Sequence, residues 1–144
     1  MNKQIFTAVC DRLKSQVTEL RWIDWDDGQA DIINERPQVA FPAALVDIVY
    51  PSCEDETDTD QLVKANIIIR LFFEPRGATN TKSPVRATAL ASFDVIDKVH
   101  AAMQGWNNSG AFAHLSRSSA TREKRRDGYK AYKLTYGTTF IESA

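Results

Sequence analysis

The residues with the clearest chemical potential lie near the C-terminal end, in the stretch TREKRRDGYKAYK from Thr121 to Lys133. Lysines and arginines crowd around one Asp-Gly pair, and two tyrosines alternate with them. Such a stretch offers cations that neutralise phosphates and aromatic rings on which bases stack. It equally suits an acidic protein surface, and a plain solvated loop tip is the third alternative. The candidate contact residues are Arg117, Arg122, Lys124, Arg125, Arg126, Lys130 and Lys133.

A second charged run, PSCEDETDTDQ from Pro51 to Gln61, is acidic and poor in apolar residues. It lacks the glycine at the sixth position and the distal glutamate of an EF-hand loop, so we expect no metal site. We expect no cofactor either, because the chain has no Walker A loop and no G-x-G-x-x-G. The run predicts a solvated loop that joins two strands. Its carboxylates are Glu54, Asp55, Glu56, Asp58 and Asp60.

Nucleophilic catalysis has little support in the sequence. A Ser, Cys or Thr nucleophile needs a base within reach, and the chain has 2 histidines. His100 falls on the apolar stripe of an expected helix, which predicts a core or boundary histidine. His114 falls in an expected strand beside serines, but no G-x-S-x-G elbow surrounds them. A nuclease would have to use Asp47, Glu74 or Glu123, which no spacing pairs, so we expect a protein that is not an enzyme.

Charge is distributed unevenly along the chain. The net charge is −1, but residues 1–60 carry 13 acids against 5 bases, and residues 61–144 carry 13 bases against 6 acids. Opposite patches on one molecule can meet head to tail on neighbouring copies. The alternative is that the two halves intermix in the folded chain.

Length and composition predict a single domain over residues 1–144. Hydrophobic residues make up 43% and charged residues 26%, and a chain of 144 residues can bury a stable core without disulfides or bound metals. No apolar run approaches the roughly 18 residues of a membrane helix, and the charged N-terminus does not match a signal peptide. We therefore expect no membrane partner and a cytoplasmic location. Cys10 and Cys53 have no metal or redox spacing, so free thiols are favoured over a disulfide, which stays open.

The elements that position these residues begin with a helix. Apolar residues at three- and four-residue steps from Ile5 to Leu20 predict an amphipathic helix. A turn follows at RWIDWDDGQ, Pro42 makes Val39–Phe41 an edge or irregular piece, and Ala44–Tyr50 predicts a strand. The clearest strand is Val63–Glu74, with one apolar face and a second, partly covered face that carries Ile68 and Phe72.

The second half of the chain predicts another helix and a hairpin. PRGATNTKSP is a loop by composition, and a helix that ends near Gly105 follows. Phe112–Ser119 and Tyr129–Phe140 predict two strands joined at Asp127-Gly128. We expect an α+β domain: a mostly antiparallel sheet of four to five strands packed by two helices, with a long projecting C-terminal hairpin that carries the basic cluster at its tip. The expected stripe of the second helix is Ala89, Phe93, Ile96, Val99, His100 and Met103.

The order of these elements resembles the small tail-terminator and neck (head-tail joining) proteins of long-tailed bacteriophages and prophages. An amphipathic helix leads into the Trp-containing segment Arg21–Trp25, and a strand begins near the proline of Phe41-Pro42-Ala43. An acidic loop, the strand IIIRLFFEP, a helix that ends at Gly-Trp and the hairpin SRSSATREKRRDGYKAYKLTYG complete the resemblance. The resemblance covers nearly the whole chain in the order of its elements and in their general residue character, and it matches no diagnostic motif.

The resemblance implies a virion structural protein, a tail terminator or tail-completion subunit. Such a subunit forms a ring, usually a hexamer, that caps the tail tube and joins it to the head. Its partners are other copies, tail-tube and neck proteins, and passing DNA; its locations are the bacterial host cytoplasm during assembly and the tail or neck of the mature virion. From charge, we expect the basic residues at a subunit interface or facing DNA, with the acidic run meeting a neighbour's hairpin. The alternative is a small DNA-binding module that uses the basic hairpin 117–133.

Overall fold

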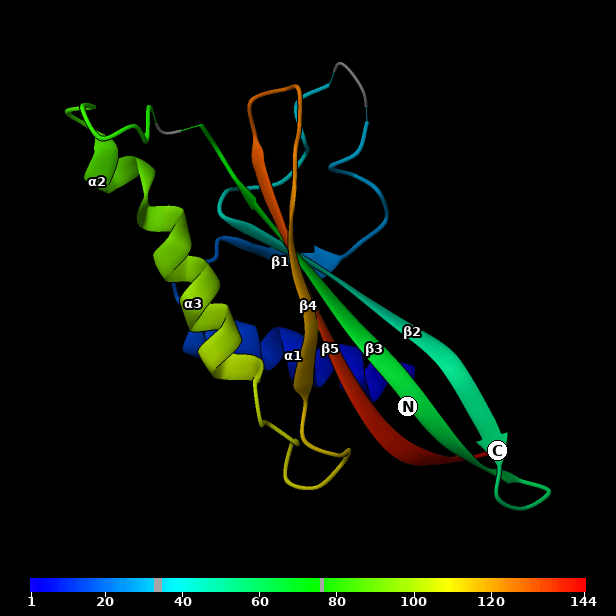
Figure 1. Ribbon diagram of the computed structural model, residues 1–144. Coiled ribbons are helices and arrows are strands. Elements are labelled where there is room, and N and C mark those ends of the chain that lie inside the picture. Colours follow the sequence, from blue (N-terminus) through cyan, green and yellow to red (C-terminus); the bar gives the residue numbers. More distant parts are fainter. Residues whose placement is uncertain (33–34, 76) are drawn as a thin grey trace.

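A five-stranded sheet makes up most of the protein together with the helices, which lie on one side of it (Figure 1). The computed structural model describes residues 1–32, 35–75 and 77–144. The predicted α+β class is confirmed. In chain order the elements are α1 (Asn2–Gln16), β1 (Trp22–Trp25), β2 (Ala43–Asp55), β3 (Asp60–Phe73), α2 (Arg86–Ala89), α3 (Ala91–Met103), β4 (Ser116–Glu123) and β5 (Lys130–Ser143).

The sheet has the strand order β1-β2-β3-β5-β4. β1 runs parallel to β2, and every other neighbouring pair is antiparallel, so the prediction of a mostly antiparallel sheet is confirmed. β3 is central and pairs with β5 over its full length, from Asp60↔Ser143 to Phe73↔Lys130. Its run of apolar residues suits a strand that has neighbours on both sides.

The main core lies between the sheet and the two long helices. The predicted apolar face of β3, from Val63 to Phe73, is buried there against α1 and α3. A smaller cluster lies on the opposite face, where residues of the segments 26–32 and 35–42 cover Phe72 and Ala131. The expectation that the second face of β3 is partly covered is therefore confirmed.

Both long helices differ in detail from the sequence prediction. α1 ends at Gln16, although Val17 beyond it is still buried. The stripe predicted for α3 is wrong at Phe93, whose side chain is 58% exposed. The predicted Val99 and Met103 are buried, and so are Val95 and Ala102, which the predicted stripe omitted. Val95, Val99 and Ala102 occupy the i, i+4 and i+7 positions of one helical face. Phe93 precedes Val95 by two residues, roughly 200° around the helix, so it faces solvent.

The strands extend further than predicted at one place and shift at another. The acidic run predicted as a loop is largely strand, because the antiparallel ladder continues through Glu54↔Leu62 and Asp55↔Gln61. Residues 56–59 alone form the turn. β1 was not predicted as a strand, and β4 starts at Ser116 instead of Phe112, because Phe112 and Leu115 enter the core before the strand begins.

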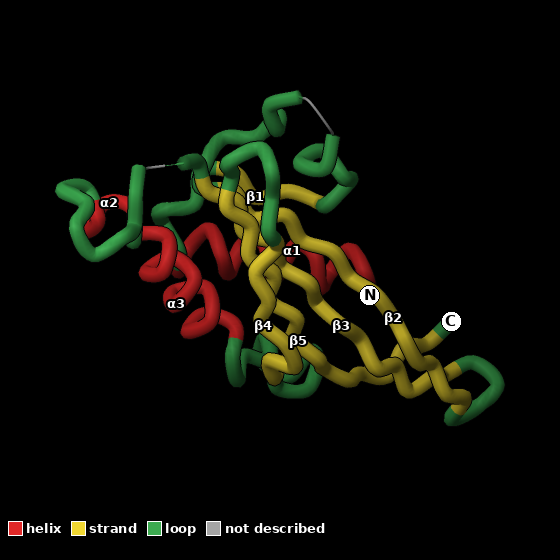
Figure 2. Tube along the Cα trace, turned by 45° about the horizontal axis from the view of Figure 1, so that its top comes forward, coloured by secondary structure: helices red, strands yellow, loops and turns green. Residues whose placement is uncertain are grey.

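The two hairpins turn at opposite ends of the sheet (Figure 2). The β2–β3 turn lies beside Asp60, and the β4–β5 turn lies beyond the last β3–β5 pair, Phe73↔Lys130. The predicted Asp127-Gly128 turn is confirmed, with Gly128 at φ 84°. β3 has 14 residues at about 3.3 Å each, so about 45 Å separates the two turns.

Candidate assembly surface

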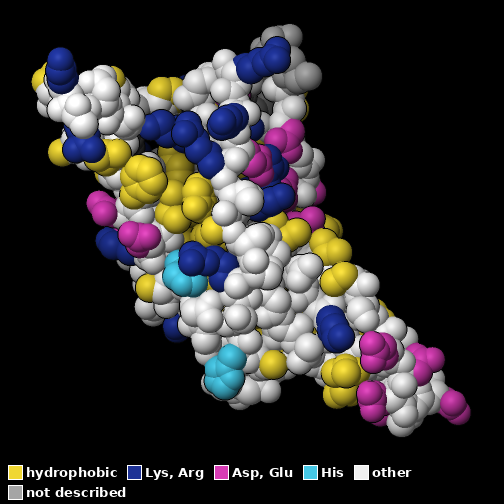
Figure 3. All heavy atoms as spheres, viewed as in Figure 1, with side chains coloured by type: hydrophobic (Ala, Val, Ile, Leu, Met, Phe, Trp, Pro, Cys, Tyr) yellow, Lys and Arg dark blue, Asp and Glu magenta, His cyan; other side chains and the backbone are white. Residues whose placement is uncertain are grey.

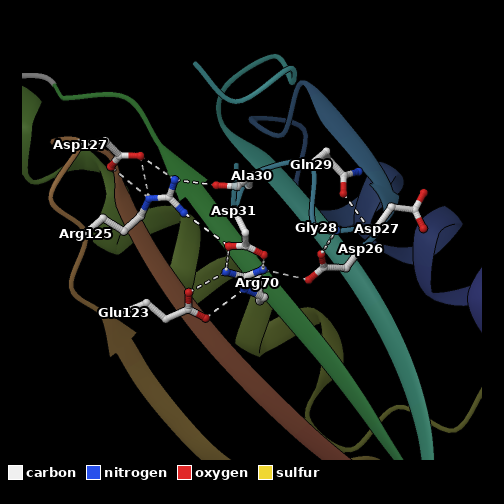
Figure 4. Close-up of polar contacts among 10 residues, drawn as sticks. All are labelled: Asp26, Asp27, Gly28, Gln29, Ala30, Asp31, Arg70, Glu123, Arg125 and Asp127. Carbon is white, nitrogen blue, oxygen red and sulfur yellow. Dashed lines mark hydrogen bonds and ion pairs between the residues drawn. The ribbon is translucent and has the colours of Figure 1, made fainter. Parts of the chain in front are cut away.

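Arg125 lies inside a charged network instead of on the outer surface of its hairpin (Figure 4). Its guanidinium donates hydrogen bonds of 2.6 Å to Asp127 Oδ2 and of 2.6 Å to the backbone carbonyl of Ala30. It also lies 5.5 Å from the centroid of the Phe72 ring, and its side chain is 13% exposed. The expectation that Arg125 belongs to the exposed basic surface is corrected, because the segment that carries Ala30 folds over the sheet and engages it.

Arg70 on β3 is the second cation of this network. Its guanidinium makes bidentate pairs with Glu123 at 2.7 and 2.9 Å and with Asp31 at 2.8 and 2.9 Å, and it reaches Asp26 at 3.1 Å. The bidentate geometry is the strong form of an arginine–carboxylate contact. Arg70 therefore ties β4 and the segment 26–31 to the central strand.

Hydrogen bonds keep the network in its charged form. The hydrogen bonds from Arg70 hold the pKa of Asp31 below its usual value, and those from Arg125 do the same for the pKa of Asp127. In return, the hydrogen bonds with Asp31 raise the pKa of Arg70. Every charge here has a partner within the chain, so the network is structural. It neutralises part of the charge asymmetry, because Asp26 and Asp31 belong to the acidic half and both arginines to the basic half.

The other predicted basic residues stay exposed or half-exposed. Arg117 is the cross-strand partner of Tyr136 and Arg122 that of Tyr132, so these two arginines share the helix-bearing face of the sheet. Lys133 lies on the opposite face, and Lys124 and Arg126 lie in the turn. Within the described residues, no ion pair involves any of these side chains: Arg117, Arg122, Lys124, Arg126, Lys130 and Lys133. Figure 3 shows basic side chains gathered at this end of the sheet.

The acidic residues gather at the opposite tip, on the β2–β3 hairpin (Figure 3). Glu54 and Asp55 end β2, Glu56 and Asp58 lie in the turn, and Asp60 begins β3. In the part of the chain that the structure describes, none of the five forms an ion pair; the polar contact of Asp55 is with Gln61 Nε2 at 2.9 Å. The structure therefore brings the acidic set together and the basic set together, but keeps the two sets apart.

The remaining reactive side chains do not converge on these sets. His100 is half-buried, as predicted, with Nδ1 2.9 Å from the Tyr136 hydroxyl. His114 is exposed and precedes β4, so its predicted place in a strand is wrong. Cys10 is half-buried on α1, Cys53 is exposed on β2, and both are free thiols.

Across residues 1–32, 35–75 and 77–144, no three His, Cys, Asp or Glu side chains are arranged to hold a metal ion. No helix in the same ranges has the length and apolar character needed to cross a membrane.

No protein-family model matches this chain, and no curated protein matches it. The fold and the placement of charge are therefore the features that bear on function.

Sequence reasoning missed Arg70 and its carboxylate partners. A signal was present, because Arg70 alternates with Ile68 and Phe72 on a strand face expected to be covered. An arginine in such a place needs carboxylates nearby, since burying an unpaired charge is costly. The sequence offers no means to select Asp26, Asp31 and Glu123 among 19 acids, because the choice depends on how the segment after β1 crosses the sheet.

Proposed function

We propose that this chain is a structural subunit of a phage virion, a tail terminator or tail-completion protein whose copies join head to tail in a ring. One observation carries the proposal: the acidic hairpin lies at one end of the sheet, and the exposed basic residues extend from Arg117 at its middle to Arg122 and the β4–β5 turn at its other end. Neither set forms ion pairs among the described residues. Opposite charges at two ends favour a heterologous contact between copies, which closes into a ring when the rotation between neighbours allows it. The resemblance in element order supports the placement at the end of a tail tube.

In this proposal the two charged ends have separate partners. The acidic hairpin meets the basic residues of the next copy, which sets the register between subunits. Basic side chains left outside that contact line the channel through which DNA passes. The hexameric number of copies, the tail tube and the neck proteins as partners, and the locations in the host cytoplasm and the mature virion follow the resemblance.

Light scattering across a concentration series, at low and moderate salt, tests the proposal. We expect one discrete oligomer whose population falls as salt rises, because exposed ion pairs are screened. The double variant Glu54→Lys, Asp55→Lys should shift the protein to the monomer. The matched control Asp94→Lys, Asp97→Lys changes the same charge on exposed positions of α3 and should leave the oligomer intact.

A rescue experiment makes this test specific. Arg117→Glu with Arg122→Glu should also prevent assembly. A mixture of the acidic-end and basic-end variants should restore the oligomer with the two variants alternating, because both contacts between unlike variants pair opposite charges. A protein that stays monomeric at every concentration, also with a tail-tube protein present, would overturn the proposal. The proposal would also be overturned if the acidic-end and basic-end reversals, combined in one chain, had effects on assembly that simply add in a double-mutant cycle.

The second candidate function is a DNA-binding module. The observation that favours it is the arrangement around Tyr132, a half-exposed ring whose cross-strand partner is Arg122 and whose neighbour two residues earlier on the same face is Lys130. Cations beside an aromatic face suit a nucleic-acid strand. The acidic hairpin has no part in this function, which separates it from the first proposal.

A further inference from the structure

The outer edge of β2 is covered along half of its length. β1 pairs with β2 from Ala43 to Val46, and the Asp26 N–H then donates to the Val46 carbonyl at 3.0 Å. Peptide groups alternate in direction along a strand, so Ile48 also turns its N–H and carbonyl to this edge. The Ile48 N–H donates to the adjacent Asp47 carboxylate at 2.9 Å, a local bond that an added strand would replace.

An apolar groove runs beside this open edge. It holds about 340 Å³ and is lined by Phe6, Trp25 and Ile48, with Asn2 and Lys3 at its side. The Phe6 and Trp25 rings lie 6.3 Å apart, and Trp25 is 58% exposed. An exposed aromatic next to an unpaired strand edge offers area that an added strand would bury.

The other edge of the sheet is β4, which pairs with β5 alone among the described strands. Its residues from Ser116 to Arg122 are exposed, and the side chains are polar or small. The Arg117 N–H donates to Gln104 Oε1 at 2.9 Å, so the open part of this edge begins after Arg117. β4 contributes Arg117 and Arg122, whereas β2 contributes Asp47, Glu54 and Asp55 and no base.

We infer that β4 of one copy adds to the open edge of β2 in the next copy, so that the sheet continues from subunit to subunit. The inference rests on the proposed function and specifies its interface. Strand direction agrees with it: β2, β3, β5 and β4 alternate in direction, so β2 and β4 run antiparallel within one copy. Two copies placed side by side in the same orientation therefore bring these edges together as an antiparallel pair.

β1 determines the stagger between the copies. Within one chain, Ser116 is level with Val49 through Gly137 and Asn66. Because β1 occupies Ala43–Val46, the incoming strand must move along β2 toward the acidic hairpin. A stagger of this kind is what a sheet needs in order to close on itself.

The displaced strand places opposite charges together, which is why a second copy fits this edge. Arg117 moves toward Glu54 and Asp55, and Arg122 moves toward the groove, where its guanidinium can stack on the exposed Trp25 ring. Pro51 has no N–H, so the backbone pairing is confined to the part of β2 that precedes it. Side-chain ion pairs continue the contact beyond that point.

Cross-linking between two single-cysteine variants tests the inference. Val49→Cys and Thr121→Cys lie on the helix-free face of the two edges, and both carry Cys53→Ser to remove the exposed native thiol. Burial raises the pKa of Cys10 to about 11, so this thiol reacts slowly. The two proteins, one with an affinity tag that changes its mass, are mixed and treated with a short bismaleimide.

We expect mixed Val49→Cys/Thr121→Cys dimers to exceed either homodimer several-fold and to decline when Arg122→Glu is added to the Thr121→Cys protein. The control pair is Val49→Cys with Ala101→Cys, an exposed position on α3. A discrete oligomer whose mixed dimers stay at the control level would overturn the edge contact and leave the ring proposal standing. A protein that stays monomeric by light scattering at every concentration, also with a tail-tube protein present, would overturn both.

Discussion

Arg70 is the residue on which the position of the segment 26–31 depends. Its side chain is 13% exposed and holds three carboxylates, two of them by bidentate pairs. Arg70→Gln would leave Asp26 and Glu123 half-buried without their cation and Asp31 with Arg125 alone, so we predict a loss of about 3 kcal/mol in the free energy of unfolding. Urea unfolding followed by tryptophan fluorescence measures this. The exposed Arg122→Gln should change stability by no more than about 0.5 kcal/mol, and equal losses in the two variants would contradict the role given to Arg70.

His100 makes stability depend on pH near neutrality. Burial, followed by the positive charge of Arg117, lowers the pKa of His100 in the folded protein. Below the unfolded value of about 6.5 the unfolded chain therefore binds more protons. This part of the stability is present above about pH 6.5 and is lost as the pH falls through the folded pKa.

The corresponding prediction concerns the Arg117 charge. Arg117→Gln should raise the pKa of His100 toward its ordinary value, because a nearby positive charge disfavours the imidazolium. An NMR titration of the His100 ring measures this directly. Arg122→Gln removes the same charge further along β4 and should leave the titration unchanged; a shift of equal size in both variants would assign the effect to the net charge of the protein.

At the scale of elements, two glycines of the β4–β5 hairpin should respond oppositely to alanine. Gly137 lies inside β5 with ordinary φ, and an added Cβ would meet its nearest atom at 3.9 Å, so Gly137→Ala should stabilise the fold by about 0.5 kcal/mol. Gly128 has φ +84° in the turn, where Gly128→Ala should cost about 1 kcal/mol. Thermal unfolding of both variants measures the pair, and a stabilised Gly128→Ala protein would show that the turn adopts another conformation.

The elements that could be predicted from sequence are those whose pattern is local. β3 alternates from Val63 to Leu71, and α1 shows its stripe from Ile5 to Leu13, so both follow from periodicity. β1 could not be found in this way, because four residues carry too little pattern and the strand exists through its parallel pairing with Ala43–Val46. The acidic run was predicted as a loop because its carboxylates disfavour a strand locally. The ladder to β3, which is not local, overrides this preference.

At the scale of the whole molecule, the charge split visible in the sequence has two fates. Part of it is neutralised internally, because Asp31 comes from the acidic half and engages both Arg70 and Arg125. The rest remains on the two hairpins, and this placement follows from topology. β3 and β5 are adjacent and antiparallel, so the turn that precedes β3 and the turn that precedes β5 lie at opposite ends of the sheet. Composition predicts that charge is available for contacts, but the strand order determines where it is presented.

At this scale, assembly and DNA binding can be separated, because assembly requires the acidic hairpin and DNA binding requires only the basic residues. Binding of a DNA duplex through the basic end would weaken with salt, with a logarithmic slope of about −0.9 per phosphate contact, and the acidic hairpin would not contribute. Under the assembly proposal, Glu54→Lys with Asp55→Lys removes the oligomer, because it reverses charges that only a neighbouring copy neutralises. We therefore expect this variant to be monomeric, and its affinity for a DNA duplex, measured by fluorescence anisotropy at low salt, to be no lower than that of the parent. An acidic-end variant that remains oligomeric, together with tight DNA binding that Arg117→Gln and Arg122→Gln abolish, would make the basic hairpin a DNA contact instead of a subunit contact.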